Sequence, residues 1–515
     1  MITMSGRTRE GLAILAAGLA LGIAADVLAH TVPERLNVAV ALGALALVFG
    51  FMTQRGLISL PPRLAPIGVP LGLLCVALIW RDSPTLFTLN LAGVAGLVSL
   101  ASPRVVAVSP KHAGVADYAW GAGQMLAGIT LGGIPLLLSD IEWRSIPRKG
   151  RVRAASDAAV GLAVALPVLT VFSGLLMDSD PVFSRLMSDA FRVKIDFLVE
   201  HGFAICFWSW TAAGLLRVFT KTQAQPGEFA HTWAGRLRLG QVGTVVGLVD
   251  LLFLAFVAVQ FRYLFGGADL VRQVIGLSYA EYARSGFFDL VAVVALSLPL
   301  LLFADWSLDR QDHQAVRIFR QLACLMLVLL NVMLASALFR MRLYTLEYGL
   351  TELRFYTTAF MGWLVLVFGW FAATVLRGKR PRFAFGALTA ALLVLLSLNL
   401  LTPDSLIAAT NLSRAPAGRP FDPAYTAALS ADALPTTRRE LHTLSRGQAC
   451  VLAAILKDRW DTDFARANRW DMSYVRARRS HWQDGAMRCP PWNQTQSGDV
   501  SRPTGVAEGG LRPQL

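Results

Sequence analysis

Charged residues are scarce in this sequence, and signatures of catalysis or nucleotide binding are missing. Asp, Glu, Lys and Arg make up 16% of the 515 residues. The chain carries no Walker loop, Gly-x-Ser-x-Gly elbow, His-Glu-x-x-His pair, Cys-x-x-Cys pair or dinucleotide fingerprint. These absences disfavour primary pumps and the common redox enzymes, and they give no reason to expect a cofactor or a bound metal.

Cysteine is also rare, with five in the whole chain. Cys75, Cys206 and Cys324 lie inside apolar blocks, where a thiol packs as a small hydrophobic group. Cys450 and Cys489 lie in a polar C-terminal tail. If that tail is outside the cytoplasm, the oxidising compartment allows the two to form a disulfide; two unpaired thiols in a cytoplasmic tail are the alternative.

Apolar residues, in contrast, are abundant and come in long blocks. They make up 55% of the sequence, and the mean hydropathy is +0.51. Each block runs for roughly 17–25 residues, enough for a helix to cross a hydrocarbon core of about 30 Å, whereas barrel strands are about ten residues long and alternate in polarity. We therefore expect an all-α polytopic transmembrane bundle of about 11–13 helices with a mostly helical soluble tail. The candidate spans are residues 11–29, 36–52, 64–80, 84–101, 119–138, 155–177, 196–219, 240–263, 286–304, 318–339, 355–377 and 383–401.

The net charge of +14 comes from basic residues that lie between the apolar blocks. This placement follows the positive-inside rule and indicates a lipid bilayer as the partner, not nucleic acid. From the sixth span onward, every second connection is strongly basic and should be cytoplasmic. The tail then lies on the extracytoplasmic side of a bacterial inner membrane. These basic connections lie near residues 144–153, 217–238, 310–320 and 377–382.

The chain divides into four expected regions: N-terminal transmembrane helices (1–145), a transmembrane core (146–401), a soluble helical tail (402–490) and a disordered C-terminus (491–515). We interpret the first span as a retained helix rather than a signal peptide, because it is long and contains Asp26. The Gly-rich span 119–138 is the weakest of the set. If the N-terminus is cytoplasmic, one of the front spans is miscounted.

Ionisable residues inside the expected spans are few. Asp250 falls near the middle of its span, Asp26 lies within the first, and Glu200 and His201 lie in the outer half of the seventh. A carboxylate at the membrane centre is costly unless it is protonated or paired, so Asp250 is a functional candidate. The alternative is a structural hydrogen bond between a protonated Asp250 and a neighbour such as Asn331.

Two outward connections carry acidic residues with plausible structural roles. Asp180 before Pro181 fits a helix N-cap followed by proline at the first helical position, which leaves Asp178 as the better functional candidate of the two. Glu281 completes a capping box that begins three residues earlier, and aromatic residues around it suit a membrane interface. Neither feature explains Arg284.

A third outward stretch combines arginine and tyrosine. If this stretch is a helix that leaves the membrane, one of its sides carries Arg340, Tyr344 and Tyr348. Another side carries Glu347, Thr351 and Arg354. Arginines at a helix end snorkel to lipid phosphates. The alternative is a site for an anionic solute or a lipid headgroup, because guanidinium and tyrosine hydroxyl groups suit phosphate or carboxylate.

These outward stretches, with a segment after the last span, resemble an uncharacterised bacterial family of polytopic membrane proteins, the domain of unknown function 4173. The resemblance covers roughly residues 145–435 and implies topology but no substrate. The stretches that carry it are Asp178–Phe183, Tyr263–Gly267, Ser278–Phe288, Tyr344–Arg354, Asn411–Arg414, Asp422–Tyr425 and Leu429–Ala433.

Three functions remain open from the sequence. The first is transport. Asp250, together with Glu200 or His201, would bind and release a proton or cation, and the outer arginines would bind an anionic solute. The second is an envelope enzyme for lipid-linked substrates, with an outer carboxylate as base. The third is a non-enzymatic sensor or assembly partner that binds through its tail.

Overall fold

The computed structural model describes residues 5–32, 34–56, 64–143, 171–184, 195–221, 239–265, 287–308, 312–466 and 472–479, with four further positions between 161 and 169. The helices of the bundle are α1 (Gly6–Thr31), α2 (Glu34–Gln54), α3 (Ala65–Trp80), α4 (Pro84–Leu100), α5 (Pro103–Val108), α6 (Val115–Leu131), α7 (Gly133–Pro135), the π-helix η2 (Leu136–Asp140), α10 (Ile195–Lys221), α12 (Leu239–Phe265), α15 (Phe287–Ser307), α16 (His313–Tyr348), α17 (Glu352–Thr374) and α18 (Phe383–Leu401). The tail contains α19 (Pro403–Arg414), α20 (Pro423–Ala428), α21 (Leu434–Glu440), α22 (Arg446–Arg466) and α23 (Met472–Arg479).

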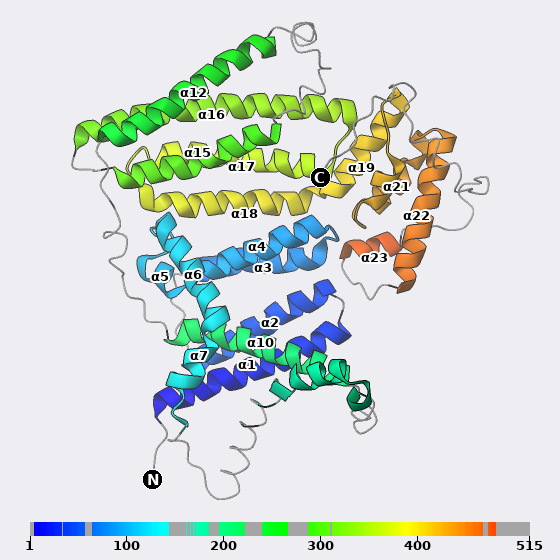
Figure 1. Cartoon of the computed structure of the whole chain (residues 1–515). Helices are drawn as coiled ribbons and strands as arrows, with labels where there is room; N and C mark the ends of the chain where they lie inside the picture. Colours follow the sequence, from blue (N-terminus) through cyan, green and yellow to red (C-terminus); the bar gives the residue numbers. More distant parts are fainter. Residues whose placement is uncertain are drawn as a thin grey trace, which may run out of the picture.

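The expected all-α membrane bundle is confirmed. Within the described residues, eight helices are long and apolar enough to cross a membrane. The α3 and α4 helices also lie along the bundle direction but are shorter; the 16 residues of α3 make about 24 Å of helix. Every expected span except 155–177, which falls partly outside the described residues, coincides with one of these helices or with the bent α6–α7 segment (Figure 1).

The bundle has two chemically different ends, on the right and left of Figure 1. The tail end carries α19–α23, which follow directly on α18. The opposite end, named the basic end here, holds two buried aspartates with arginine partners. Asp140 pairs with Arg7 at 3.2 Å and with Arg217 at 2.6 Å, and Asp305 pairs with Arg380.

The α6–α7 segment is a bent pair of helices. Its first helix begins beside α5 at the basic end, and its last residue, Asp140, is bonded to arginines of that same end. Between these points the chain bends by 54°, and the segment stays at the left of Figure 1. The expected crossing at 119–138 stays a prediction, because a bent pair of this kind fits both a broken span and a re-entrant loop. Apolar composition alone does not distinguish a helix that crosses from a bent pair that enters and returns.

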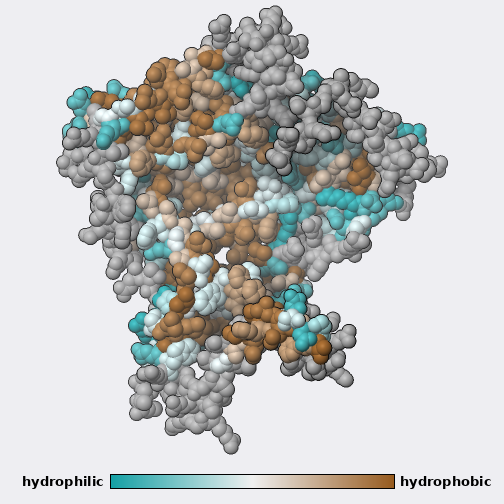
Figure 2. All heavy atoms as spheres, in the orientation of Figure 1, coloured by the Kyte–Doolittle hydropathy of each residue, from teal (hydrophilic) through white to brown (hydrophobic). Residues whose placement is uncertain are grey.

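The largest hydrophobic core lies among α12, α15, α16 and α17. The 36-residue α16 supplies much of it, including the fully buried Ala323, Met326 and Leu330. The outward surface of this group is apolar too: Leu248, Leu251 and other α12 side chains are exposed. Figure 2 shows hydrophobic residues over much of the upper part of the bundle and hydrophilic residues on the side of the tail. Exposed leucines on a helix with a buried opposite face are typical of a lipid-facing surface.

The tail is a helical unit with its own core. Thr402, between α18 and α19, adopts a left-handed conformation with φ +50°, which sharply redirects the chain after the last span. Pro435 stands in the first turn of α21, where proline is tolerated. An apolar face near the start of α22 packs inward; its members are Leu444, Ala449, Leu452 and Ile455.

Candidate functional site

Asp250 lies near the middle of the 27-residue α12, on its buried face. Val246 and Phe253, one turn away on either side, belong to the core shared with α15, α16 and α17. The Asp250 residue is only 3% exposed, and neither carboxylate oxygen has a hydrogen-bond partner. The Asn331 side chain instead donates to Leu327 O of its own helix at 2.7 Å. The structural alternative, a bond between Asp250 and Asn331, is therefore not formed.

Asp26, Glu200 and His201, which the sequence offered as separate candidates, form one cluster with His30. His201 Nδ1 lies 2.7 Å from Asp26 Oδ2, and His30 Nδ1 lies 2.8 Å from the Asp26 carbonyl oxygen. His30 Nε2 is 3.4 Å from Glu200 Oε1. The two imidazole rings face each other with their centroids 4.1 Å apart. The cluster therefore joins the tail-end part of α1 to that of α10.

The packing of α1 on α10 explains why Asp26 meets His201. The two helices run antiparallel in close contact. A Cβ atom on Gly22 would lie 2.0 Å from Ser209 Oγ and 2.7 Å from Ile205 O, so only glycine permits this approach. One turn beyond Gly22 on α1 is Asp26, and one turn beyond Ile205 on α10 is His201. The small-residue stripe thus sets the register that brings the two polar side chains together.

The arginine and tyrosine stretch forms the turn between α16 and α17. Gly349, with φ +84°, ends α16 at Tyr348, so the expected single helix is not formed. Thr351 caps the next helix, α17, and Arg354 lies in its first turn. The Arg354 guanidinium lies 3.9 Å from the centre of the Tyr344 ring and donates to Gly349 O. Arg340 is buried within α16, and Tyr348 is 48% exposed.

Two residues of the tail helix α19 are hydrogen-bonded to this turn. Arg414 of α19 donates to Leu346 O at 2.8 Å and to Glu347 O at 2.9 Å. The Asn411 amide bonds both backbone groups of Leu350, at 2.7 and 2.8 Å. The polar residues after the last span therefore hold the α16–α17 turn against α19.

The remaining candidates are divided. Asp178 is exposed at the end of the helix that precedes Asp180, and Asp180 Oδ1 accepts from Val182 N at 2.8 Å as a helix cap does. Glu281 and Arg284 lie outside the described residues. Cys450, half-buried on α22, is disulfide-bonded. Because Cys489 lies outside the described residues, the pairing of these two cysteines stays a prediction.

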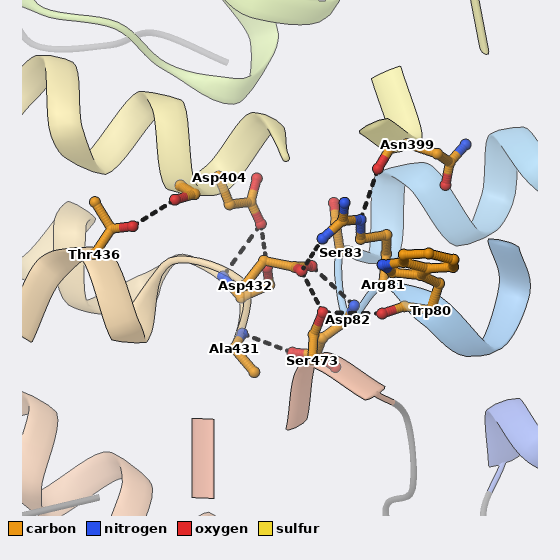
Figure 3. A network of polar contacts seen from close by, with 12 residues as sticks. Trp80, Arg81, Asp82, Ser83, Asn399, Asp404, Ala431, Asp432, Thr436 and Ser473 are labelled. Carbon is orange, nitrogen blue, oxygen red and sulfur yellow. Dashed lines mark hydrogen bonds and ion pairs between the residues drawn. The ribbon is translucent and has the colours of Figure 1, made fainter. Parts of the chain in front are cut away.

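A buried polar network connects the end of α3 to the tail (Figure 3). Arg81 pairs with Asp432 at 3.3 Å, and both side chains are less than one-tenth exposed. The Asp432 carboxylate also accepts from Asp82 N at 2.9 Å and from Ser473 Oγ. Arg81 Nε donates to Asn399 O at 2.7 Å. Arg81 and Asp432 compensate each other's charge, so this network is an anchor for the tail and not an open binding site.

Asp404, at the start of α19, is fully buried beside this network. Its Oδ2 accepts from Ser430 N at 3.3 Å and from Ser430 Oγ, whereas Oδ1 has no hydrogen-bond partner. Burial, together with the nearby carboxylates of Glu352 and Asp432, raises the pKa of Asp404 to about 7.

Comparison with protein families assigns most of these residues to one domain. The family model described as "Domain of unknown function (DUF4153)" matches residues 68–440. This chain belongs to the DUF4153 family. An uncharacterised family was expected, but the number 4173 is not confirmed. The DUF4153 match begins within α3, so it also covers front helices that the expected resemblance left out. No curated protein and no solved structure matches the chain.

The DUF4153 region contains Asp250, Glu200, His201, the α16–α17 turn and most of the tail anchor. Asp26 and His30 precede it. Sequence reasoning missed His30, Arg81, Asp82 and Asp404. Arg81 and Asp82 carried one available signal, because opposite charges that directly follow an apolar span must find partners at the membrane surface.

Proposed function

We propose that this DUF4153 protein is a transport-type protein of a bacterial inner membrane that moves protons through its helical bundle, with Asp250 as the proton carrier. The supporting observation is that both oxygens of this deeply buried carboxyl lack a hydrogen-bond partner. The basic end of the bundle would face the cytoplasm, and the tail would face the outside. This orientation follows the positive-inside rule, because arginines and a lysine lie at the basic end.

The chemistry follows from the cost of charge in an apolar core. An ionised carboxylate without a partner is strongly disfavoured there, whereas the neutral acid is tolerated. Asp250 therefore holds a proton at rest and releases it only when water or a cation reaches it. A group that alternates between these two states in the middle of a span is what proton translocation requires.

An anionic solute remains a less supported cargo. The Arg354 and Arg414 guanidinium groups are engaged with backbone carbonyls of the α16–α17 turn. An anion at this place would have to displace those bonds. We therefore assign the proton, and not the anion, as the transported species.

The test is proton uptake into vesicles that contain the purified full chain. A potassium gradient with valinomycin provides the driving potential, and a pH-sensitive dye reports the internal pH. We expect Asp250→Asn to lower the rate by about tenfold or more, which corresponds to about 1.4 kcal/mol in the barrier. Asp250→Glu should retain part of the rate because the carboxyl group is kept.

Asp289→Asn is the matched control, because Asp289 is an exposed carboxylate in the first turn of the neighbouring α15. Its rate should equal that of the unmodified protein. The proposal is overturned if vesicles with the unmodified chain take up protons no faster than empty ones, or if Asp250→Asn keeps the full rate.

A further inference from the structure

A second cluster of ionisable groups lies away from Asp250 and plays no part in the proton proposal. The potential ligand atoms of Asp26, His30 and His201 all lie within 4.8 Å of one another. Glu200 adds a carboxylate oxygen 3.4 Å from His30 Nε2. We propose that these four residues bind one divalent transition-metal ion of the Zn²⁺ type, which clamps α1 to α10 at the tail end.

The hydrogen bonds of His30 prepare one ring nitrogen for a metal. A carbonyl oxygen only accepts, so the 2.8 Å contact with Asp26 O requires His30 Nδ1 to donate. In the neutral ring, Nε2 then carries the lone pair, and it points toward Glu200. Metal-binding histidines are commonly held in this way, with the second ring nitrogen donating to a backbone carbonyl.

The carboxylate of Asp26 supplies an independent sign of a ligand. Its side chain is only 7% exposed, and Oδ1 has no hydrogen-bond partner. His30 Nδ1 is 3.5 Å from this oxygen, but that nitrogen already donates to the Asp26 carbonyl. A buried carboxylate oxygen without a donor is costly, and a cation would satisfy it.

Charge and ligand type select the ion. Two neutral imidazoles with two carboxylates carry a charge of about −2, which a divalent ion balances. Mixed nitrogen and oxygen ligands without a thiolate suit Zn²⁺, whereas Mg²⁺ and Ca²⁺ prefer oxygen alone.

A tetrahedral ion requires the ligand atoms of Asp26, His30 and His201, which lie within 4.8 Å of one another, to draw closer together. With metal–ligand bonds of about 2.0 Å, neighbouring ligand atoms lie about 3.3 Å apart. The His30–Glu200 pair, at 3.4 Å, already has this spacing. The Asp26–His201 pair, at 2.7 Å, has the spacing of a hydrogen bond, which the ion would replace. The scaffold is firm because α1 and α10 pack closely through Gly22.

The experiment measures metal content and thermal stability of the purified full chain, isolated without a polyhistidine tag. After EDTA and dialysis, ZnCl₂ is added and bound zinc is determined by mass spectrometry. We expect about one Zn²⁺ per chain and a melting temperature raised by a few degrees. His30→Gln should weaken binding by about tenfold or more and remove the rise.

His442→Gln is the matched control, because His442 is an exposed tail histidine that contacts Arg439 O and lies outside the cluster. It should bind zinc normally. His201→Gln provides a second ligand variant in case His30→Gln folds poorly. The assignment is overturned if the unmodified chain binds no zinc, if both ligand variants bind it as tightly, or if Mg²⁺ binds equally well.

Discussion

Asp82, which follows α3, is joined by two hydrogen bonds to the tail segment that contains Ala431 and Asp432. The Asp82 N–H donates to Asp432 Oδ2 at 2.9 Å, and Asp82 Oδ2 accepts from the N–H of Ala431 at 2.8 Å. Two carboxylates this close would repel each other without counter-charges. Arg81 and Arg35 supply these, at 3.3 Å from Asp432 and 3.5 Å from Asp82. The tail is therefore a docked part of the bundle.

Removal of Asp432 should release the tail. Asp432→Ala leaves the buried Arg81 guanidinium without its counter-charge, and breaking one partner of a buried pair costs about 3–5 kcal/mol. We expect a lower melting temperature and faster hydrogen exchange in α21 and α23.

The control is Asp458→Ala, at an exposed position on α22, which should change neither quantity. The double variant Arg81→Met with Asp432→Leu removes both charges and should recover part of the loss. Unchanged exchange in Asp432→Ala would show that the ion pair does not hold the tail.

Asp404 should make stability depend on pH. Its folded-state pKa of about 7 lies above the ordinary value of 3.8, because burial penalises the charged form. As the pH rises from about 4 to about 7, the unfolded chain releases this proton before the folded protein does. Folding therefore becomes less favourable across this window and levels off above it.

Asp404→Asn removes the ionisation and should flatten this part of the pH profile. Melting temperatures between about pH 5 and pH 8 test it, with Asp458→Asn as an exposed control that keeps the slope. The melting temperature of Asp404→Asn should exceed that of the unmodified protein by the largest amount at the alkaline end of this range. An equal gain at all pH values would exclude the titration of Asp404 as the cause.

Close packing of α1 on α10 should be sensitive to a single methyl group. Gly22→Ala would place Cβ 2.7 Å from Ile205 O, so the helices must separate. Overpacking of this kind costs about 1–3 kcal/mol. Gly43→Ala on α2 is the control, because no atom lies within 4 Å of its new Cβ. Equal melting temperatures for the two variants would contradict the observed helix contact.

Much of the bundle could be predicted because apolar runs of sufficient length directly report membrane helices. The spans that became α1, α12 and α18 needed no tertiary information. The bend of the α6–α7 segment could not be predicted in this way. Whether the segment returns to the basic end depends on the contacts of Asp140 with Arg7 and Arg217, which join residues far apart in the sequence.

The candidate site was predicted only in pieces. Asp250 was found because one carboxylate in an apolar span is visible locally. The cluster of His30 and His201 was not, because the two residues lie on helices whose pairing is set by the contact of Gly22 with Ser209. The spacing of residues in the sequence does not indicate which helices pack against each other.

The side of the membrane on which the tail lies can be tested with introduced cysteines and a membrane-impermeant maleimide. Ser413 is exposed on α19 at the tail end, and Lys379 is exposed at the basic end. We expect Ser413→Cys to react from outside in intact spheroplasts and Lys379→Cys only after permeabilisation, because basic residues stay on the cytoplasmic side.

The same labelling tests whether α6–α7 returns to its starting side. Lys111 precedes α6 and Glu142 follows η2, and both residues are exposed. If the segment re-enters, cysteines at these two positions react together with Lys379→Cys, only after permeabilisation. Labelling of Lys111→Cys and Glu142→Cys from opposite sides would instead make the segment a crossing. The unmodified chain is the blank, because it reports any reaction of Cys206 and Cys324, which are exposed on α10 and α16.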